Sequence, residues 1–241
     1  MSIFDRRAPT PDAVLRYDDR PGAVIDVYLP DSPASTVVTY LHGGFWREAY
    51  DRRHARPLAR ALADDGQVVL LPEFRRVGGG GGWPVTCDDV ALAFARIPEL
   101  LPLVDVRLER HVLTGHSAGG HLTLWLVAQG VSVDLAVAIA PVGDLRAAAA
   151  IGMGNGAVDD FLGGTAPVDA ADPAVLLARR RPAYPVRIVH GTADDSVTIE
   201  NSRGLVARYP WIDLLELDGV DHFDPIDPTA AAFAAVTTAL A

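Results

Sequence analysis

The strongest constraint on the fold is a repeated alternation of short apolar runs with longer amphipathic stretches. The apolar runs are rich in Val, Ile and Leu, are bounded by turn residues and therefore predict strands. They are Ala23–Leu29, Thr36–Leu41, Gln67–Leu71, His111–Thr114, Val133–Ala140, Val186–His190 and Ile212–Leu217. The other stretches carry apolar residues at helical spacing. They are Asp51–Asp64, Thr86–Leu100, Ala118–Ala128, Glu200–Tyr209 and Thr229–Leu240.

Strands that are apolar on both faces and separated by helices predict an α/β fold. Such strands form a parallel sheet whose crossover helices cover both faces. We expect about eight strands, mostly parallel, with the first two antiparallel. A chain of 241 residues suits one domain of this kind, so we predict a single domain over residues 1–241.

One region interrupts the alternation. Gly143 to Pro185 is rich in Gly and Ala and is too long for an ordinary connection between a strand and a helix. We expect a few short helices here, forming a cap insertion over residues 144–185 that covers the functional site. The alternative is an ordinary crossover with surface decoration.

Composition excludes several classes of protein. The formal net charge is −10, whereas a nucleic-acid-binding protein needs a basic face. The single cysteine, Cys87, excludes an intrachain disulfide and a cysteine-based zinc site. Residues 111–133 lack Asp, Glu and Arg but include His, Ser, Gln and Gly, so they predict a strand, a turn and a buried helix rather than a membrane span. Without an apolar leader, we expect a cytoplasmic protein with no membrane partner.

In parallel sheets, ligand sites lie beyond the carboxyl ends of the strands. The strand at His111–Thr114 is followed by Gly115-His116-Ser117-Ala118-Gly119, a G-x-S-x-G motif between a strand and a helix. A serine on such a tight turn exposes its hydroxyl, and the small flanking residues permit the backbone crowding. The start of the helix favours a developing negative charge. We therefore predict that Ser117 is a nucleophile; the alternative is a glycine-rich turn without catalysis.

The strand at Thr36–Leu41 is followed by His42-Gly43-Gly44-Phe45-Trp46. Glycines at this place let the backbone turn its N–H groups inward, and acyl transfer needs such donors for the carbonyl oxygen that becomes an oxyanion. The predicted donors are the N–H groups of Gly44 and of Phe45 or Gly43, together with that of Ala118. His42 is expected to organise the loop.

A serine nucleophile needs a base, and the base needs a carboxylate that orients it. His222 is the histidine that follows the final strand, so it is the predicted base. The acid should follow the strand at Val186–His190, where Asp194 and Asp195 both stand. Asp194 is favoured because it is the fifth residue of an H-G-x-x-D-x-x-V run; Asp195 is the alternative.

Together, the segments His42–Trp46, Gly115–Leu122 and Asp221-His222-Phe223 resemble the α/β-hydrolase superfamily. Within it they are similar to the esterases and lipases related to hormone-sensitive lipase. The aromatic pair after His-Gly-Gly and the His-Phe pair at the base are most similar to kynurenine formamidases. The resemblance covers nearly the whole chain after Ala23. Phe45 departs from the longer lipase motif, which has a third glycine there.

This resemblance implies the order Ser, Asp, His for a catalytic triad of Ser117, Asp194 and His222. It also implies hydrolysis of a small ester or formamide through an acyl-enzyme, with N-formylkynurenine as the first candidate substrate. A general short-chain carboxylesterase is the alternative, and a non-catalytic ligand-binding protein on the same fold is a third hypothesis.

Three side chains are candidates for substrate binding: Trp46, Trp83 and His116. The two indoles could form an aromatic wall, or they could be ordinary core residues. We expect no cofactor and no metal site, because the chain has no H-E-x-x-H or similar grouping of ligands. The expected partner is a small ester or amide, and an apolar edge strand near the C-terminus makes a homodimer possible.

Overall fold

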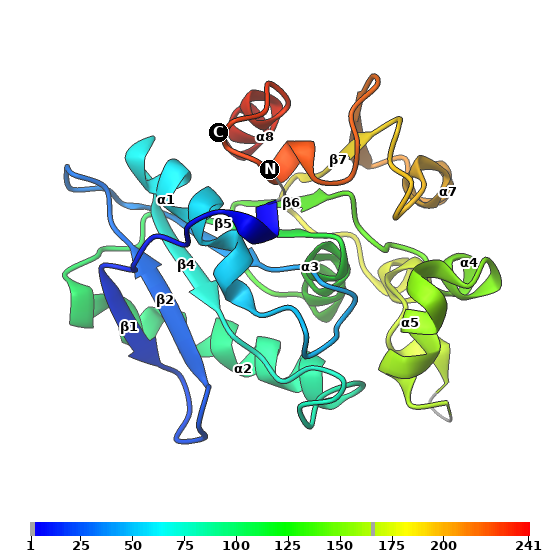
Figure 1. Ribbon diagram of the computed structural model, residues 1–241, viewed down its shortest axis with the longest axis horizontal. Coiled ribbons are helices and arrows are strands. Elements are labelled where there is room, and N and C mark those ends of the chain that lie inside the picture. Colours follow the sequence, from blue (N-terminus) through cyan, green and yellow to red (C-terminus); the bar gives the residue numbers. More distant parts are fainter. Residues whose placement is uncertain (1–2, 165–166) are drawn as a thin grey trace.

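The computed structural model describes residues 3–164 and 167–241. Its centre is an eight-stranded sheet with the order β1-β2-β4-β3-β5-β6-β7-β8 (Figure 1). The strands are β1 (Ala13–Arg16), β2 (Val24–Tyr28), β3 (Thr36–Leu41), β4 (Val68–Pro72), β5 (Arg110–His116), β6 (Leu135–Ile139), β7 (Val186–Gly191) and β8 (Ile212–Leu217).

The sheet is mostly parallel, as the sequence predicts. From β4 to β8 every neighbouring pair is parallel, whereas β2 is antiparallel to both β1 and β4. The strands expected first, β2 and β3, do run in opposite directions, but β4 lies between them. The strand β1 was not predicted, because this short edge strand alternates half-buried with exposed residues and lacks an apolar run.

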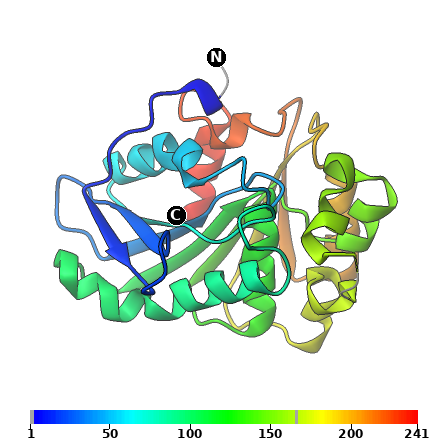
Figure 2. The same cartoon turned by 60° about the horizontal axis from the view of Figure 1, so that its bottom comes forward.

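Helices cover both faces of the sheet, as predicted (Figure 1, Figure 2). On one face, α1 and α8 pack in a shared core with residues of β3, β4 and β6. On the other face, α2, α3 and α7 contribute to a second core. The helices are α1 (Arg56–Asp64), α2 (Val85–Leu100), α3 (Ala118–Gln129), α4 (Leu145–Ala150), α5 (Met153–Leu162), α6 (Pro173–Leu176), α7 (Ile199–Arg208) and α8 (Phe233–Leu240).

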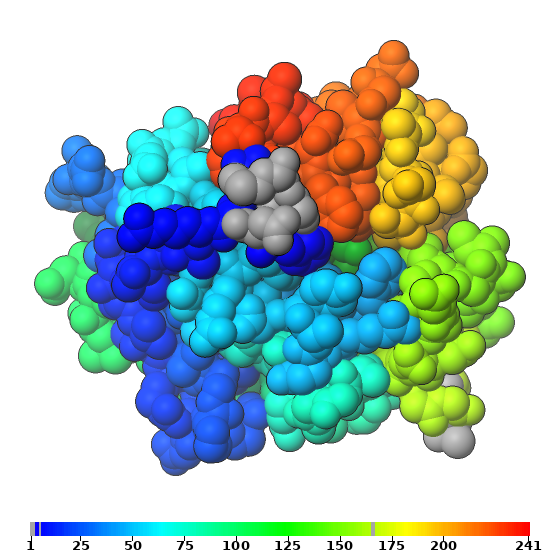
Figure 3. Space-filling view, in the orientation of Figure 1, coloured from blue at the N-terminus to red at the C-terminus, as the bar shows by residue number. Residues whose placement is uncertain are grey.

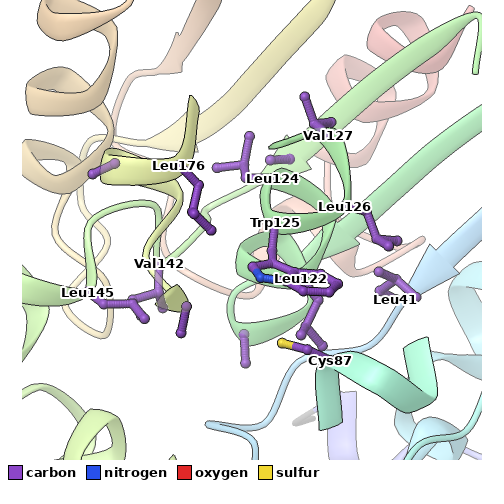
Figure 4. Packing of buried hydrophobic residues seen from close by; sticks show 14 of the residues in the cluster. Leu41, Cys87, Leu122, Leu124, Trp125, Leu126, Val127, Val142, Leu145 and Leu176 are labelled. Carbon is purple, nitrogen blue, oxygen red and sulfur yellow. The ribbon is translucent and has the colours of Figure 1, made fainter. Parts of the chain in front are cut away.

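The central helix α3 explains the long uncharged stretch of the sequence. Its residues 118–127 are all buried, so the helix is apolar on every side because it lies inside the protein. Figure 4 shows Leu122 and Trp125 of α3 near Cys87 of α2, in one core cluster. Within the described part of the chain, none of the helices has the length and apolar character that crossing a membrane requires.

The segment between β6 and β7 contains the short helices α4, α5 and α6. At Gly154, Asn155 and Gly156 the backbone has positive φ angles of 58°, 54° and 78°. A Cβ atom on Gly154 would lie 2.5 Å from the Phe45 ring, so this turn packs closely on the loop that follows β3. Whether residues 144–185 work as a cap stays a prediction, and residues 165–166 of that range lie outside the described residues.

Candidate active site

The predicted site residues follow four strand ends at one edge of the sheet. The His42–Phe45 loop follows β3, and Ser117 follows β5. Asp194 comes after β7, and His222 comes after β8. Because these strands are parallel, their carboxyl ends meet at the same edge and bring together residues that are far apart in the chain.

Ser117 occupies a strained turn between β5 and α3. Its backbone has φ 57° and ψ −117°, a conformation that a residue with a side chain rarely adopts. The Ser117 N–H donates to the Ile139 carbonyl at 2.9 Å, and the Ser117 carbonyl accepts from the His121 N–H at 3.0 Å. These bonds to β6 and to α3 hold the turn that the G-x-S-x-G motif predicts.

The two glycines of this motif, Gly115 and Gly119, are required because a side chain at either position would clash with the backbone. A Cβ atom on Gly119 would lie 1.9 Å from the Leu41 carbonyl oxygen, and one on Gly115 would lie 2.4 Å from the Gly119 carbonyl oxygen. Both neighbours are backbone atoms that cannot rotate away. The end of β3, the end of β5 and the start of α3 therefore approach each other more closely than side chains would allow.

His222 and Asp194 form a buried pair. The His222 Nδ1 atom lies 2.6 Å from Asp194 Oδ2. The other carboxylate oxygen, Oδ1, accepts from the N–H groups of Ser196 at 2.9 Å and Val197 at 2.8 Å. Asp195 is exposed, and its carboxylate accepts from the Ser196 hydroxyl at 3.2 Å. The geometry therefore favours Asp194 over Asp195 as the partner of His222.

A second histidine supports the same carboxylate. His190 Nε2 lies 3.2 Å from Asp194 Oδ2, and His190 Nδ1 lies 2.7 Å from Ser202 Oγ. Burial alone would raise the pKa of Asp194, but the interactions with the His190 and His222 imidazoles outweigh it and hold this pKa well below its usual range. Asp194 is therefore a carboxylate at neutral pH. Nothing in the sequence pattern indicates this contact of His190, which stands at the end of a predicted strand.

The predicted oxyanion-hole residues lie beside Ser117. A Cβ atom on Gly43 would lie 2.9 Å from the His116 carbonyl oxygen and 3.2 Å from the Ser117 Cβ. Gly44 and Phe45 have φ angles of 113° and 53°, so the chain turns sharply here. Ala118 is the first residue of α3, and the first N–H groups of a helix have no acceptor within the helix. That these N–H groups stabilise an oxyanion stays a prediction.

The loop that contains Gly43 and Gly44 is anchored by Glu73, which contacts His42. His42 Nε2 lies 3.3 Å from Glu73 Oε1, and the His42 ring stacks on Phe74 with a centroid distance of 4.3 Å. Arg76 and Arg52 also donate hydrogen bonds to this carboxylate. Burial would raise the pKa of Glu73, but the hydrogen bond and charge of His42 and the charge of Arg76 hold it below its usual range. Glu73 follows β4 without a recognisable motif, so its role is not predictable from the sequence.

Ser117 and His222 line the same cavity, which has a volume of about 70 Å³. The remaining lining residues are Phe4, Gly44, Phe45, Tyr50, His54, His116 and Phe223. His116 is thus a wall residue, and its Nε2 lies 2.9 Å from the His222 carbonyl oxygen. No pattern in the sequence indicates that the other wall residues come together; they include Phe4, Tyr50, His54 and Phe223.

The two predicted tryptophans lie outside the lining of this cavity. Trp46 is buried, donates its Nε1–H to His121 Nδ1 at 3.2 Å and stacks on Phe161 with a centroid distance of 4.7 Å. Trp83 packs edge-on against Trp125 at 6.1 Å. The structure therefore supports the alternative of core residues over an aromatic wall for the substrate. Within residues 3–164 and 167–241, no three His, Cys, Asp or Glu side chains are grouped to hold a metal ion.

Buried histidines make the stability depend on pH. Burial lowers the pKa of His54, His111 and His121 to about 4. The pKa of His116 lies well below 6.5, mainly because of burial and secondly because of repulsion from His222. In the unfolded chain each titrates near its ordinary value of about 6.5. Between about pH 6.5 and 4 the unfolded chain thus binds more protons. The free energy of unfolding should therefore decrease as the pH is lowered through this window, by up to about 1.4 kcal/mol per pH unit for each histidine.

Urea unfolding between pH 4 and 7.5 measures this slope, with the free energy of unfolding determined at steps of about half a pH unit. His111→Gln should reduce the slope by up to about 1.4 kcal/mol per pH unit, since glutamine does not titrate. Asp194, whose pKa is lowered, stays ionised through this window and loses its contribution only at more acidic pH. A slope that is the same with and without His111 would contradict the prediction.

Comparisons with known proteins agree on the architecture. A family model described as BD-FAE matches residues 25–137, and a model of the prolyl oligopeptidase family matches residues 94–210. Each covers somewhat less than half of the chain. The search among curated protein sequences gives no match.

Several solved structures match almost the whole chain. Esterase B from Lactobacillus rhamnosis, inhibited by a tributyrin phosphonate, has a TM-score of 0.82 at 20% identity, covering 98% of this chain and 85% of that chain. A truncated carbohydrate esterase from gut microbiota has a TM-score of 0.78 at 19% identity, covering 95% of both chains. A thermophilic esterase from Thermogutta terrifontis with bound propionate has a TM-score of 0.73 at 20% identity, covering 98% and 93%. None of these three is described as a kynurenine formamidase. The strand order, the helices on both faces and these matches show that the chain has the α/β-hydrolase fold.

Proposed function

We propose that the protein is a serine hydrolase that cleaves esters of short-chain carboxylic acids. One arrangement supports this proposal. Ser117, on its strained turn, lines the same cavity as His222. His222 Nδ1 is hydrogen-bonded to the buried carboxylate of Asp194 at 2.6 Å. This is the set of nucleophile, base and orienting carboxylate that acyl transfer needs.

The geometry suggests how each group acts. His222 donates its Nδ1–H to Asp194, so its Nε2 keeps a lone pair and can take the proton of the Ser117 hydroxyl. The Ser117 oxygen attacks the ester carbonyl, and the N–H groups near Gly44 and that of Ala118 stabilise the resulting oxyanion. His222 then protonates the leaving alcohol. A water molecule, activated by the same base, releases the acid from the acyl-enzyme.

The size of the cavity supports a short acyl group. A volume of about 70 Å³ is far below the several hundred Å³ of sites for drug-sized ligands. The Thermogutta terrifontis esterase carries propionate, and the Lactobacillus rhamnosis esterase carries a tributyrin phosphonate, so two proteins of this fold bind short acyl groups or their analogues. A formyl group is smaller still. N-formylkynurenine, the finer prediction from the sequence, is therefore tested beside the esters.

The test is hydrolysis of p-nitrophenyl acetate, butyrate and octanoate and of N-formylkynurenine, followed by absorbance. We expect turnover of acetate and butyrate, weak turnover of octanoate, and a loss of roughly 10⁴-fold or more in kcat for Ser117→Ala. Ser32→Ala, in an exposed loop, is the matched control and should behave as the parent. Preference for the formamide would make the protein a formamidase. If every substrate is hydrolysed no faster than by Ser117→Ala, the non-catalytic hypothesis replaces the proposal.

A further inference from the structure

A second, larger cavity adjoins the one that contains Ser117. We call it the outer cavity; its volume is about 310 Å³, compared with about 70 Å³ for the inner one. The two cavities share a wall made of Phe4, Tyr50 and His54. The outer cavity is further lined by Arg6, Ala8, Ala49, Asp51 and Arg53 but not by Ser117 or His222.

The shared wall is held by contacts between three distant parts of the chain. The Phe4 ring lies 5.4 Å from the Tyr50 ring, 5.3 Å from the His54 ring and 5.6 Å from the Phe223 ring, measured between centroids. Two anchors fix the segment that carries Phe4: Ile3 is buried, and Arg6 donates to Asp227 at 2.5 Å. Figure 3 shows this blue segment between the light-blue residues around 50 and the orange C-terminal part.

The position of the wall indicates which half of a substrate would reach the outer cavity. In the proposed mechanism His222 protonates the leaving group, which must therefore lie on the His222 side of the reacting carbon. The Phe223 ring is 4.9 Å from the His222 ring and contacts Phe4, so the shared wall stands on that side. The inner cavity has room for the reacting carbonyl and a short acyl group. A leaving group too large for the inner cavity would therefore extend toward Phe4 and the outer cavity.

The shared wall also indicates the chemistry of that group. All three wall side chains are flat rings, and burial keeps His54 neutral at physiological pH by lowering its pKa to about 4. Neutral rings bind other rings through stacked or edge-on contacts. We propose that the outer cavity is the leaving-group site and that it binds an alcohol containing a ring. This inference rests on the proposed ester hydrolysis.

The experiment fills the outer cavity and compares two acetate esters. Ala49 lines only the outer of the two cavities and is exposed, so Ala49→Trp can place a large side chain there. The substrates are ethyl acetate and 1-naphthyl acetate, which have the same acyl group and differ in the leaving group. We expect Ala49→Trp to lower kcat/KM for the naphthyl ester about tenfold relative to that for the ethyl ester. The inhibition constant of 1-naphthol against ethyl acetate hydrolysis should rise by about the same factor.

Two further variants keep the test decisive. Ala8→Trp fills the outer cavity from the N-terminal side and should give the same shift if Ala49→Trp fails to fold. Ala95→Trp, on the exposed face of α2, should leave both esters unaffected. If the parent hydrolyses both esters and neither filling variant changes their ratio, the leaving-group site is refuted while ester hydrolysis stands. If the parent hydrolyses neither ester, it is the proposed function that fails.

Discussion

Replacing Asp194 by asparagine is expected to lower kcat for a short-chain ester by about four orders of magnitude, with little change in KM. Oδ1 of Asp194 accepts from two backbone N–H groups, so the amide oxygen of an asparagine would take this place. Its NH₂ group would then face His222 Nδ1 and donate to it. The proton of the neutral imidazole would move to Nε2, and the base would lose the lone pair that accepts the proton of Ser117.

The neighbouring residue offers a matched control. Asp195→Asn makes the same chemical change one position along the chain, at an exposed carboxylate. We expect its kcat to stay within about twofold of the parent value, since surface substitutions of this kind have small effects. Steady-state kinetics on p-nitrophenyl acetate distinguishes the two variants. If Asp195→Asn loses most of its activity and Asp194→Asn retains it, the carboxylate that orients His222 is Asp195, and the assignment to Asp194 is wrong.

The second large effect concerns stability. Gly119→Ala places a Cβ atom 1.9 Å from the Leu41 carbonyl oxygen and 2.6 Å from that of His42. Neither neighbour is a flexible side chain, so α3 must move away from the end of β3. Overpacking of this kind costs about 1–3 kcal/mol or more, and we expect the upper end of that range because backbone atoms have to shift. Urea unfolding followed by circular dichroism measures the loss.

Gly204→Ala provides the opposite case with the same chemical change. Gly204 lies inside α7, is exposed, and a Cβ atom on it would meet no other atom within 4 Å. Alanine is a better helix former than glycine, so this variant should be more stable than the parent by about 0.5–1 kcal/mol. Equal unfolding midpoints for the two alanine variants would show that the contact between α3 and β3 is not as close as described.

The sequence predicts much of this molecule because each successful signal is local. A buried strand needs an apolar run, and the turn after β5 needs small residues around Ser117, so both leave a pattern within a few positions. Asp194 and His222 could be named as candidates because each stands just beyond a recognisable strand. The strand β1 leaves no such pattern, since at the edge of the sheet it requires only a weak alternation of burial.

The walls of the inner cavity could not be predicted in the same way. Phe4 and Phe223 meet through tertiary packing, and nothing near either residue specifies the other. Proximity along the chain is also misleading: Trp46 adjoins the glycine loop, yet its positive φ of 56° turns it into the core, where its N–H finds His121. A side chain's neighbours in space depend on backbone direction, which the composition of a loop does not determine.

The order of the strands along the chain has a consequence for the synthesis of the protein. Ser117 follows β5, whereas Asp194 and His222 follow the last two strands of the chain. A polypeptide leaving the ribosome therefore contains Ser117 well before the proposed base and carboxylate have been added. A serine hydroxyl without a base is a poor nucleophile. Under the proposed mechanism, Ser117 therefore gains its nucleophilic character only after β7, β8 and the segments that follow them have folded onto the sheet.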